Sequence, residues 1–390
     1  MTEDYKNPPS RGDIFYPQSM KILHLCNDFC GSKVHTNLYQ AIDKIGDIEQ
    51  TIFTYIKDRQ LIGKNQFESK RTHFLYSTAL KKYHRYLYHI KINDIFKSLI
   101  SMTDCTQFTL VHAVTLFSDG GLAFKIHKKY GIPYFVAVRN TDVNYFLKYA
   151  PHTWHMAREI LKNAEKIIFI SPALQKLLCQ HIAIKSILPS IKSKFVIQPN
   201  GVDPFWLQNI QPIQKNHTHE ILYIGYFESE KNILKLIRSV LSLSSEYDDI
   251  KLNLVGGTGK QHNIVTGLVT KYPKHLKYWG KIYDKKQLQK IFNSNQLFAM
   301  PSLHETFGLV YIEALSQHLP IIYSKGQGID GLFKQDIGIA VNPLSELEIA
   351  SAITDIFEHP KKHQEHNLVD FNEFNWTAIA HNYKLLYHKL

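Results

Sequence analysis

Short apolar runs alternate with amphipathic segments along this chain, and the alternation starts afresh near the middle. The first apolar run, residues 21–26, is followed by a loop that contains Gly31 and then by a helical period over 32–45. A strand, a glycine-containing loop and a helix in this order open a parallel α/β sheet. Further runs repeat the order, so the sequence predicts an α/β fold with doubly wound sheets covered on both faces.

The restart follows residues 199–206, PNGVDPFW, where proline and glycine interrupt the pattern as they do in a linker or hinge. A chain of 390 residues also exceeds one ordinary hydrophobic core. The sequence therefore predicts two Rossmann-like domains that face a cleft. Before the linker, further strands are predicted at 50–55, 108–112, 134–138 and 166–170, with helices at 122–129 and 154–163. After it, strands are predicted at 220–224, 251–255, 276–278, 297–300 and 320–323, with helices at 232–243, 285–293 and 307–317.

The overall charge restricts the classes of partner. A net charge of +12 favours nucleic acid, an anionic lipid surface or a phosphate-bearing substrate. No zinc finger, RNA-binding aromatic signature or basic zipper is present, so we expect no nucleic-acid partner. The N-terminal residues lack the apolar core of a signal peptide, and no apolar run is long enough to span a membrane. We therefore expect a cytoplasmic protein.

One basic segment stands apart from the α/β pattern. Residues 64–97 hold eight Lys or Arg and only two acids, interleaved with aromatic residues. Residues 81–99 can be drawn as one amphipathic helix with a basic face and an aromatic-aliphatic face. Such a helix either adsorbs peripherally to an anionic bilayer or packs its aromatic residues into the core, and the sequence leaves both open. The residues expected to contact a membrane or an acceptor are Lys81, Lys82, Arg85 and Tyr86.

The most informative stretch is 297–315, LFAMPSLHETFGLVYIEAL. An apolar strand ends before Glu305, and a helix is expected to begin near Phe307. The backbone N–H groups of Phe307, Gly308 and Leu309 would then face a bound anion, with the positive end of the helix dipole behind them. Glycine at 308 lets a ligand approach the backbone closely. A diphosphate there would leave Glu305 and Glu313 free to reach hydroxyl groups on either side of it.

The order Pro-Ser-x-x-Glu-x-Phe-Gly-x-x-x-x-Glu-Ala resembles the signature of glycosyltransferase family 4, the retaining GT-B enzymes. The resemblance implies that Glu305 contacts the donor sugar and Glu313 the ribose. It also implies a GT-B fold, with an acceptor-side domain at 1–200, a donor-binding domain at 201–374 and a C-terminal helix at 375–390 that returns to the first domain. The implied reaction moves a hexose from a UDP- or GDP-linked sugar to a hydroxyl of a glycan or lipid-linked glycan, as in bacterial surface polysaccharide synthesis.

Other segments follow the order of the same family. Residues 221–232, ILYIGYFESEKN, resemble its diphosphate-binding segment, which implies that Lys231 binds the donor diphosphate beside Gly225. Tyr226 stands where the family usually has arginine, so one cation is missing there. The segment around Ile282 resembles the nucleobase-binding region. Gly31 resembles the glycine whose backbone meets the donor, although a simple turn also explains it.

In the first domain, the residues 138–144, VRNTDVN, follow a predicted strand and are expected to enter the cleft. Arg139 is a candidate for the missing cation, and Asp142 is a candidate for orienting the acceptor hydroxyl. The alternative is a plain strand-to-helix turn. The chain contains no Asp-x-Asp sequence, so we expect a reaction without a metal or other cofactor.

Two other functions remain open at this level. A nucleotide-sugar 2-epimerase has the same architecture and needs no acceptor. A non-catalytic nucleotide-sugar-binding partner is compatible with tyrosine at position 226.

Overall fold

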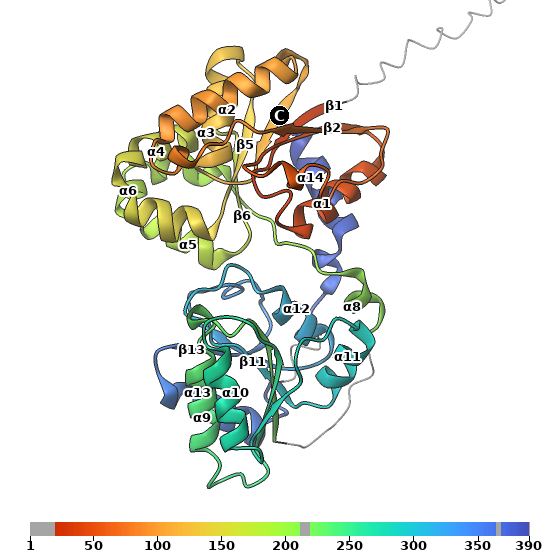
Figure 1. Cartoon of the computed structure of the whole chain (residues 1–390), viewed down its shortest axis with the longest axis vertical. Coiled ribbons are helices and arrows are strands. Elements are labelled where there is room, and N and C mark those ends of the chain that lie inside the picture. Colours follow the sequence, from red (N-terminus) through yellow and green to blue (C-terminus); the bar gives the residue numbers. More distant parts are fainter. Residues whose placement is uncertain (1–19, 211–218, 364–367, 390) are drawn as a thin grey trace, which may run out of the picture.

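The computed structural model describes residues 20–210, 219–363 and 368–389, which form two α/β domains along the long axis of the molecule (Figure 1). The polar lead-in expected at residues 1–19 lies outside the described residues, as does most of the polar stretch at 211–219. The predicted pair of Rossmann-like domains is confirmed. The boundaries at 200/201 and 374/375 remain our proposal.

The first domain is built on a seven-stranded sheet with the order β3-β2-β1-β4-β5-β6-β7, and every pair in it is parallel. Its strands are β1 (Met20–Leu25), β2 (Ile48–Tyr55), β3 (Thr72–Ser77), β4 (Leu110–Ala113), β5 (Tyr134–Val138), β6 (Lys166–Phe169) and β7 (Phe195–Ile197). The central strands are buried on both faces, which explains their nearly continuous apolar runs. Its main helices are α1 (Lys33–Ile45), α2 (Tyr88–Met102), α3 (Ser118–Tyr130), α4 (Trp154–Asn163), α5 (Pro172–Gln180), α6 (Ile182–Lys185) and α7 (Leu188–Ile191).

The second domain repeats this plan with six parallel strands in the order β10-β9-β8-β11-β12-β13. These are β8 (Glu220–Gly225), β9 (Lys251–Gly256), β10 (Leu276–Tyr278), β11 (Leu297–Ala299), β12 (Ile321–Ser324) and β13 (Gly338–Val341). Its helices are α8 (Pro204–Gln208), α9 (Ile233–Ser242), α10 (His262–Lys271), α11 (Lys285–Asn293), α12 (Leu309–Ser316) and α13 (Glu346–Glu358). In both sheets the strand order reverses beside the first strand of the domain, where open α/β sheets bind their ligands.

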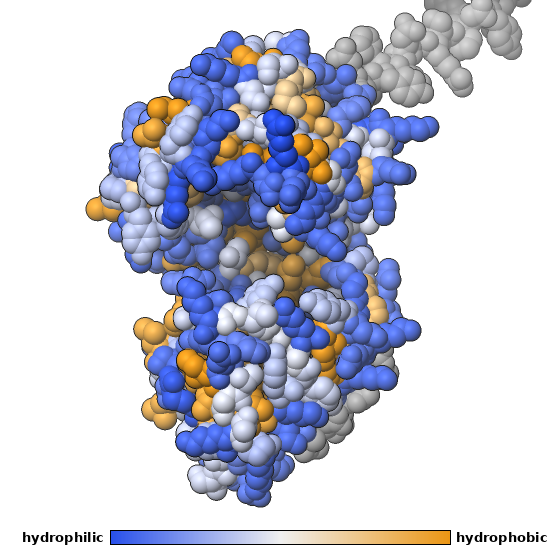
Figure 2. Space-filling view, in the orientation of Figure 1, coloured by the Kyte–Doolittle hydropathy of each residue, from blue (hydrophilic) through white to orange (hydrophobic). Residues whose placement is uncertain are grey.

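The chain crosses between the domains twice, and the two crossings touch. The backbone N–H of Val202 donates to the carbonyl of Phe374 at 3.0 Å, just before α14 (Trp376–Tyr387) begins. α14 packs against α1 of the first domain, so the predicted return of the C-terminal helix is confirmed. Its Tyr387 is fully buried, and the Tyr387 hydroxyl lies 2.8 Å from Nδ1 of His112 on β4. The space-filling view shows that the surface is hollowed between the two domains (Figure 2).

One local expectation was wrong, and the structure bears on an alternative that the sequence left open. Residues 81–99 do not form one helix, because a 3-10 turn at Lys82–Arg85 is separated from α2 by Tyr86 and Leu87. The apolar face of α2, including Ile95 and Leu99, is buried in the core of the first domain, so these residues belong to a packed surface helix. Within the described residues, no helix is both long and apolar enough to span a bilayer.

Candidate functional site

The site is assembled from two neighbouring strands of the second sheet. β8 leads into the turn that carries Lys231, and β11 leads into the loop that carries Glu305. These strands pair with each other where the strand order reverses. The carboxyl ends of parallel strands meet at one edge of a sheet, so the fold brings together two residues that lie 74 positions apart.

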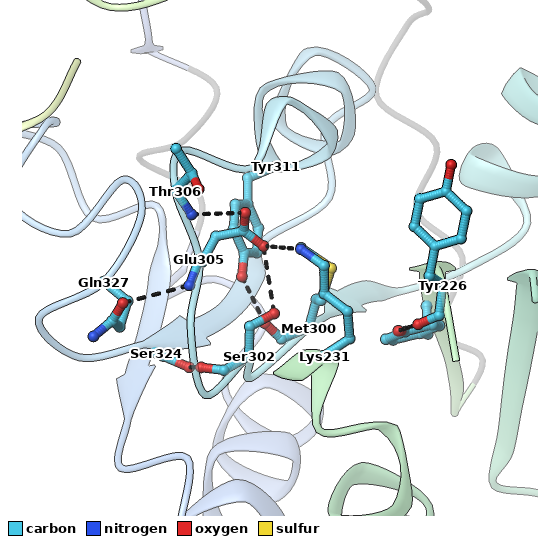
Figure 3. Close-up of polar contacts among 10 residues, drawn as sticks. Tyr226, Lys231, Met300, Ser302, Glu305, Thr306, Tyr311, Ser324 and Gln327 are labelled. Carbon is cyan, nitrogen blue, oxygen red and sulfur yellow. Dashed lines mark hydrogen bonds and ion pairs between the residues drawn. The ribbon is translucent and has the colours of Figure 1, made fainter. Parts of the chain in front are cut away.

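Glu305 and Lys231 form an ion pair at this edge (Figure 3). The Lys231 Nζ atom lies 2.7 Å from Oε2 of Glu305, whose side chain is only 8% exposed. Thr306 donates its backbone N–H to Oε1 at 3.0 Å, and the Ser302 hydroxyl lies 3.4 Å from Oε2. The remaining exposure of the Lys231 side chain, 26%, leaves part of the ammonium group accessible from solvent. A partly accessible cation next to a held carboxylate suits an anionic ligand that also carries hydroxyl groups.

The backbone around Lys231 is locked by the next residue. Asn232 adopts a left-handed conformation with φ of 58° and caps the start of α9. Its side-chain amide donates to the carbonyl of Pro301 at 2.9 Å and to that of Pro343 at 2.6 Å. The first bond ties the Lys231 turn to the strand end that precedes Glu305, and the second ties it to the loop after β13. Asparagine tolerates this conformation better than most residues, but nothing in the local sequence pattern signals the two long-range bonds.

The start of helix α12 differs from the expectation. α12 begins at Leu309, and Gly308 precedes it with φ of +80°, a left-handed conformation. A Cβ atom at position 308 would lie 2.4 Å from the ring of Tyr311, so no other residue fits without a rearrangement. Phe307 is 3% exposed and its side chain lies in the core. The predicted helix start at Phe307 is therefore wrong by two residues. Of the three residues expected to offer backbone N–H groups at the helix start, only Leu309 belongs to the helix.

Glu313 lies on α12, further along the same helix. Burial, with a smaller contribution from the nearby carboxylate of Asp203, raises the pKa of its carboxyl group to about 7. The ammonium group of Lys285 and a hydrogen bond from Trp206 oppose this shift. Glu313 is thus poised between its neutral and ionised forms near neutral pH.

The other predicted donor residues are spread over several loops. Gly225 ends β8, and its carbonyl accepts a bond from the N–H of Gly257 at 3.0 Å. Tyr226 is 63% exposed, and its ring is set apart from the Glu305–Lys231 pair (Figure 3). Ile282 is half-buried in the loop before α11. Gly31 is exposed in the turn between β1 and α1, in the other domain.

Arg139 and Asp142 follow β5 in the first domain and interact with each other. The Asp142 carboxylate accepts the backbone N–H of Arg139 at 2.8 Å and that of Leu116 at 2.9 Å. It is 1% exposed, and burial raises its pKa to about 6. The Arg139 Nε donates to the carbonyl of Val114 at 2.9 Å. Through these hydrogen bonds, the Asp142 side chain fixes the backbone of the loop that carries Arg139.

The four predicted membrane or acceptor residues lie on the 3-10 turn after β3 and beside it. All four are exposed, and three of them, Lys81, Arg85 and Tyr86, line a pocket of the first domain. Lys82 is not among the residues that line it.

Within the ranges that the structure describes, no group of three or more His, Cys, Asp or Glu is arranged to hold a metal ion. The four cysteines are free thiols, three of them buried.

The sequence analysis missed the side chains that support the acidic loop. The Ser324 hydroxyl donates to the carbonyl of Ser302 at 2.6 Å, and the Gln327 side chain lies 3.4 Å from the backbone N of Glu305. Ser324 is the last residue of β12, and Gln327 lies in the segment that follows it (Figure 3). Serine and glutamine in a loop carry no periodic signal, so only the tertiary contact reveals their role.

Comparison with known proteins finds similarity to glycosyltransferases. Residues 208–367 match the family model described as "Glycosyl transferases group 1". TuaC of Bacillus subtilis, whose name assigns it to the teichuronic acid biosynthesis glycosyltransferases, is 27% identical over 260 residues. That match covers 64% of this chain and 61% of TuaC. O-antigen chain mannosyltransferase B of Escherichia coli is 26% identical over 42% of this chain and 45% of its own length.

Solved structures of similar proteins cover nearly the whole chain. Sucrose-phosphate synthase from Thermosynechococcus elongatus is 19% identical with a TM-score of 0.68, over 95% of this chain and 98% of that one. Anabaena HepE in complex with UDP and glucose has a TM-score of 0.65 at 15% identity, over 95% of this chain and 100% of that one. The structural similarity therefore covers both domains of this chain. The second domain of this chain is thus similar to the glycosyl transferases group 1 family, and the chain as a whole has the GT-B fold.

Proposed function

We propose that this protein is a retaining glycosyltransferase that moves a hexose from a nucleoside-diphosphate sugar to a hydroxyl of a glycan or lipid-linked glycan acceptor. The observation that supports this best is the buried Glu305 carboxylate paired with Lys231 at the switch point of the second sheet. The relatives named for teichuronic acid and O-antigen synthesis favour a bacterial surface polysaccharide as the product. We place the reaction in the cytoplasm.

In the proposed reaction, the bond between the sugar anomeric carbon and the diphosphate oxygen breaks, and negative charge develops on the departing diphosphate. Lys231 and the N–H groups at the start of α12 would stabilise this charge, with Arg139 as a further cation from the first domain. Glu305 would hold hydroxyl groups of the donor sugar, and Glu313 those of the ribose. The acceptor hydroxyl attacks from the face that the diphosphate leaves, and its proton passes to the departing phosphate oxygen. No step requires a metal ion.

Glu305→Gln tests the proposed role directly. Glutamine keeps the volume and removes the charge, so the fold should be kept while transfer falls by about 100-fold or more. The measurement is the rate of nucleoside diphosphate release in the presence of acceptor, with the melting temperature as a check on folding. Glu373→Gln, an exposed glutamate before α14, is the matched control and should leave the rate unchanged. Equal rates for Glu305→Gln and the unmodified protein would remove Glu305 from the mechanism.

The donor class can be read from thermal stability. UDP, GDP, ADP and CMP are compared with and without magnesium, and the cognate diphosphate should raise the melting temperature without magnesium. Saturation at about 100 times the dissociation constant stabilises a protein by about 2.7 kcal/mol. The UDP complex of HepE makes UDP the first nucleotide to test. No stabilisation by any of the four would count against a nucleotide-sugar donor.

Acceptor dependence separates the enzyme from its two alternatives. A transferase releases nucleoside diphosphate quickly only when the acceptor is present. A nucleotide-sugar 2-epimerase would change the sugar without an acceptor, and a non-catalytic binding partner would bind the nucleotide with no turnover.

A further inference from the structure

A pocket of about 540 Å³ opens in the first domain at the carboxyl edge of its sheet. Three loops contribute to it: Lys57 follows β2, the turn with Lys81 and Arg85 follows β3, and the segment with Tyr145 and Tyr149 follows β5. α2 supplies its wall. The carboxyl edge of an open parallel sheet is where ligands bind, so the position alone makes this pocket a candidate for a substrate.

The lining of this pocket is strongly cationic. Its lining includes Lys57, Lys81, Arg85 and Lys91. No aspartate or glutamate is among the described residues that line the pocket. In the part of the chain that the structure describes, none of these four cations has a carboxylate within ion-pair distance. Like charges gathered in one pocket repel each other unless an anion joins them.

Lys91 shows this most clearly. Its Nζ atom donates to the neutral Ser118 hydroxyl at 2.7 Å and lies 5.7 Å from the centre of the Tyr55 ring. Burial lowers the pKa of the Lys91 ammonium group; the Asp119 and Asp142 carboxylates oppose this shift, and the charge of Lys57 adds to it. An anion that enters the pocket would therefore replace lost water around a partly desolvated cation, which strengthens the contact relative to a surface lysine.

Aromatic rings form the other part of the lining. Tyr86, Tyr145 and Tyr149 are 75%, 51% and 65% exposed, and the rings of the last two lie 5.9 Å apart. Tyr145 belongs to a π-helical turn, Asp142–Leu147, a geometry that is rare and frequent at functional sites. A tyrosine offers an apolar ring face with a hydroxyl at its tip, which suits the C–H face and hydroxyl groups of a sugar ring.

We infer that this pocket binds the acceptor and that the acceptor is an acidic saccharide, with a carboxylate or phosphate on the four cations and a sugar ring against Tyr145 and Tyr149. This inference rests on the proposed function for its link to transfer. A bilayer surface fits the pocket less well, because the pocket is concave and the apolar face of α2 is already buried in the core. Salt should weaken the binding, since the contact is between charges.

The test compares glucose derivatives that carry an acidic or a neutral group at C6. Binding of methyl β-D-glucuronide, glucose 6-phosphate and methyl β-D-glucoside to the full chain is measured by calorimetry. We expect at least one acidic ligand to bind about tenfold more tightly than the neutral glycoside, and the comparison between the two acids shows whether carboxylate or phosphate is preferred. Lys91→Met should remove most of this preference. Lys97→Met, which removes an exposed lysine of the same helix outside the pocket, should keep it.

Three results would overturn the inference. Equal binding of acidic and neutral ligands is one, and full preference in the Lys91→Met variant is another. The third is binding to phosphatidylglycerol vesicles that Lys91→Met abolishes while no saccharide binds, because this would make the pocket a lipid headgroup site. If Lys91→Met unfolds, Lys57→Met serves in its place, since Lys57 is exposed. Nucleotide binding measured on the same samples tests the proposed function separately, because Lys231 and Glu305 lie in the other domain.

Discussion

At the scale of single residues, the two glutamates of the Glu-x7-Glu pattern occupy different environments. Glu305 is held by Lys231 and by a backbone N–H, whereas Glu313 is desolvated on helix α12 and its pKa is raised to about 7. The first is arranged as a fixed charge. The second carries a cost of ionisation that a ligand with hydroxyl donors would relieve.

Glu313→Gln should therefore change stability in a pH-dependent way. The pKa of Glu313 is higher in the folded protein, about 7, than the ordinary value of 4.5, so the folded state binds the proton more tightly than the unfolded chain. The free energy of unfolding then falls as the pH rises from 4.5 to 7 and levels off above that. The neutral glutamine avoids this loss, so the variant should melt about 2–4 °C higher than the unmodified protein at pH 8, with a smaller difference at pH 5.

Melting temperatures at the two pH values check this prediction. Glu246→Gln, an exposed glutamate after α9, is the control and should show no pH-dependent difference. The same offset at both pH values for Glu313→Gln would contradict the assignment of a raised pKa to Glu313.

At the scale of elements, helix α14 is part of the core of a domain that lies far from it in sequence. Its buried residues pack on α1, and the hydroxyl of Tyr387 lies 2.8 Å from Nδ1 of His112 inside that core. Burial lowers the pKa of His112 to about 3, so this histidine is neutral near neutral pH. The buried Nδ1 atom of His112 then relies on the neutral Tyr387 hydroxyl for its hydrogen bond.

Tyr387→Phe removes that partner with little change in shape. A buried polar atom left without a hydrogen bond costs about 1–3 kcal/mol, so the melting temperature should fall by several degrees. Leu385→Ala on the same helix is the control, because Leu385 is 59% exposed and its loss should cost far less. An equal or smaller loss for Tyr387→Phe would mean that the contact with His112 does not contribute to stability.

At the scale of the whole molecule, both crossings between the domains meet at one point. A Cβ atom on Gly201 would lie 2.5 Å from the indole ring of Trp376, the first residue of α14. The backbone bond between Val202 and Phe374 sits beside it. This close contact joins the linker after the first domain to the returning helix.

Gly201→Ala should force the two crossings apart. We expect a fall of about 1–3 kcal/mol in the free energy of unfolding, the usual cost of overpacking, measured by urea denaturation. Gly267→Ala in helix α10 is the matched control, because nothing lies within 4 Å of a Cβ atom there. That control should stabilise the protein by about 0.5–1 kcal/mol, since alanine favours a helix over glycine. A stabilising Gly201→Ala would show that the crossing has room to move.

The residues alone indicated much of this architecture. The apolar runs predicted the central strands, because strands buried on both faces read as continuous hydrophobic segments. The edge strands β3, β7 and β13 were missed, since strands whose positions are mostly half-buried lack that signal. The Pro-Ser, Phe-Gly and Glu-Ala pairs made the loop with Glu305 recognisable in the sequence. All of these residues lie within one strand end, one loop and one helix.

Tertiary structure decided which residues from distant segments of the chain come into contact. The pairing of Lys231 with Glu305 depends on β8 and β11 being neighbours, although β9 and β10 separate them in sequence. The cationic pocket joins three loops of the first sheet, and its charge appeared in the sequence only as a basic segment. Hydrophobic periodicity is a local property that the chain carries in its order of residues. Strand order and packing bring remote side chains together. Both arise only when the whole core forms, so no local stretch of sequence reveals them.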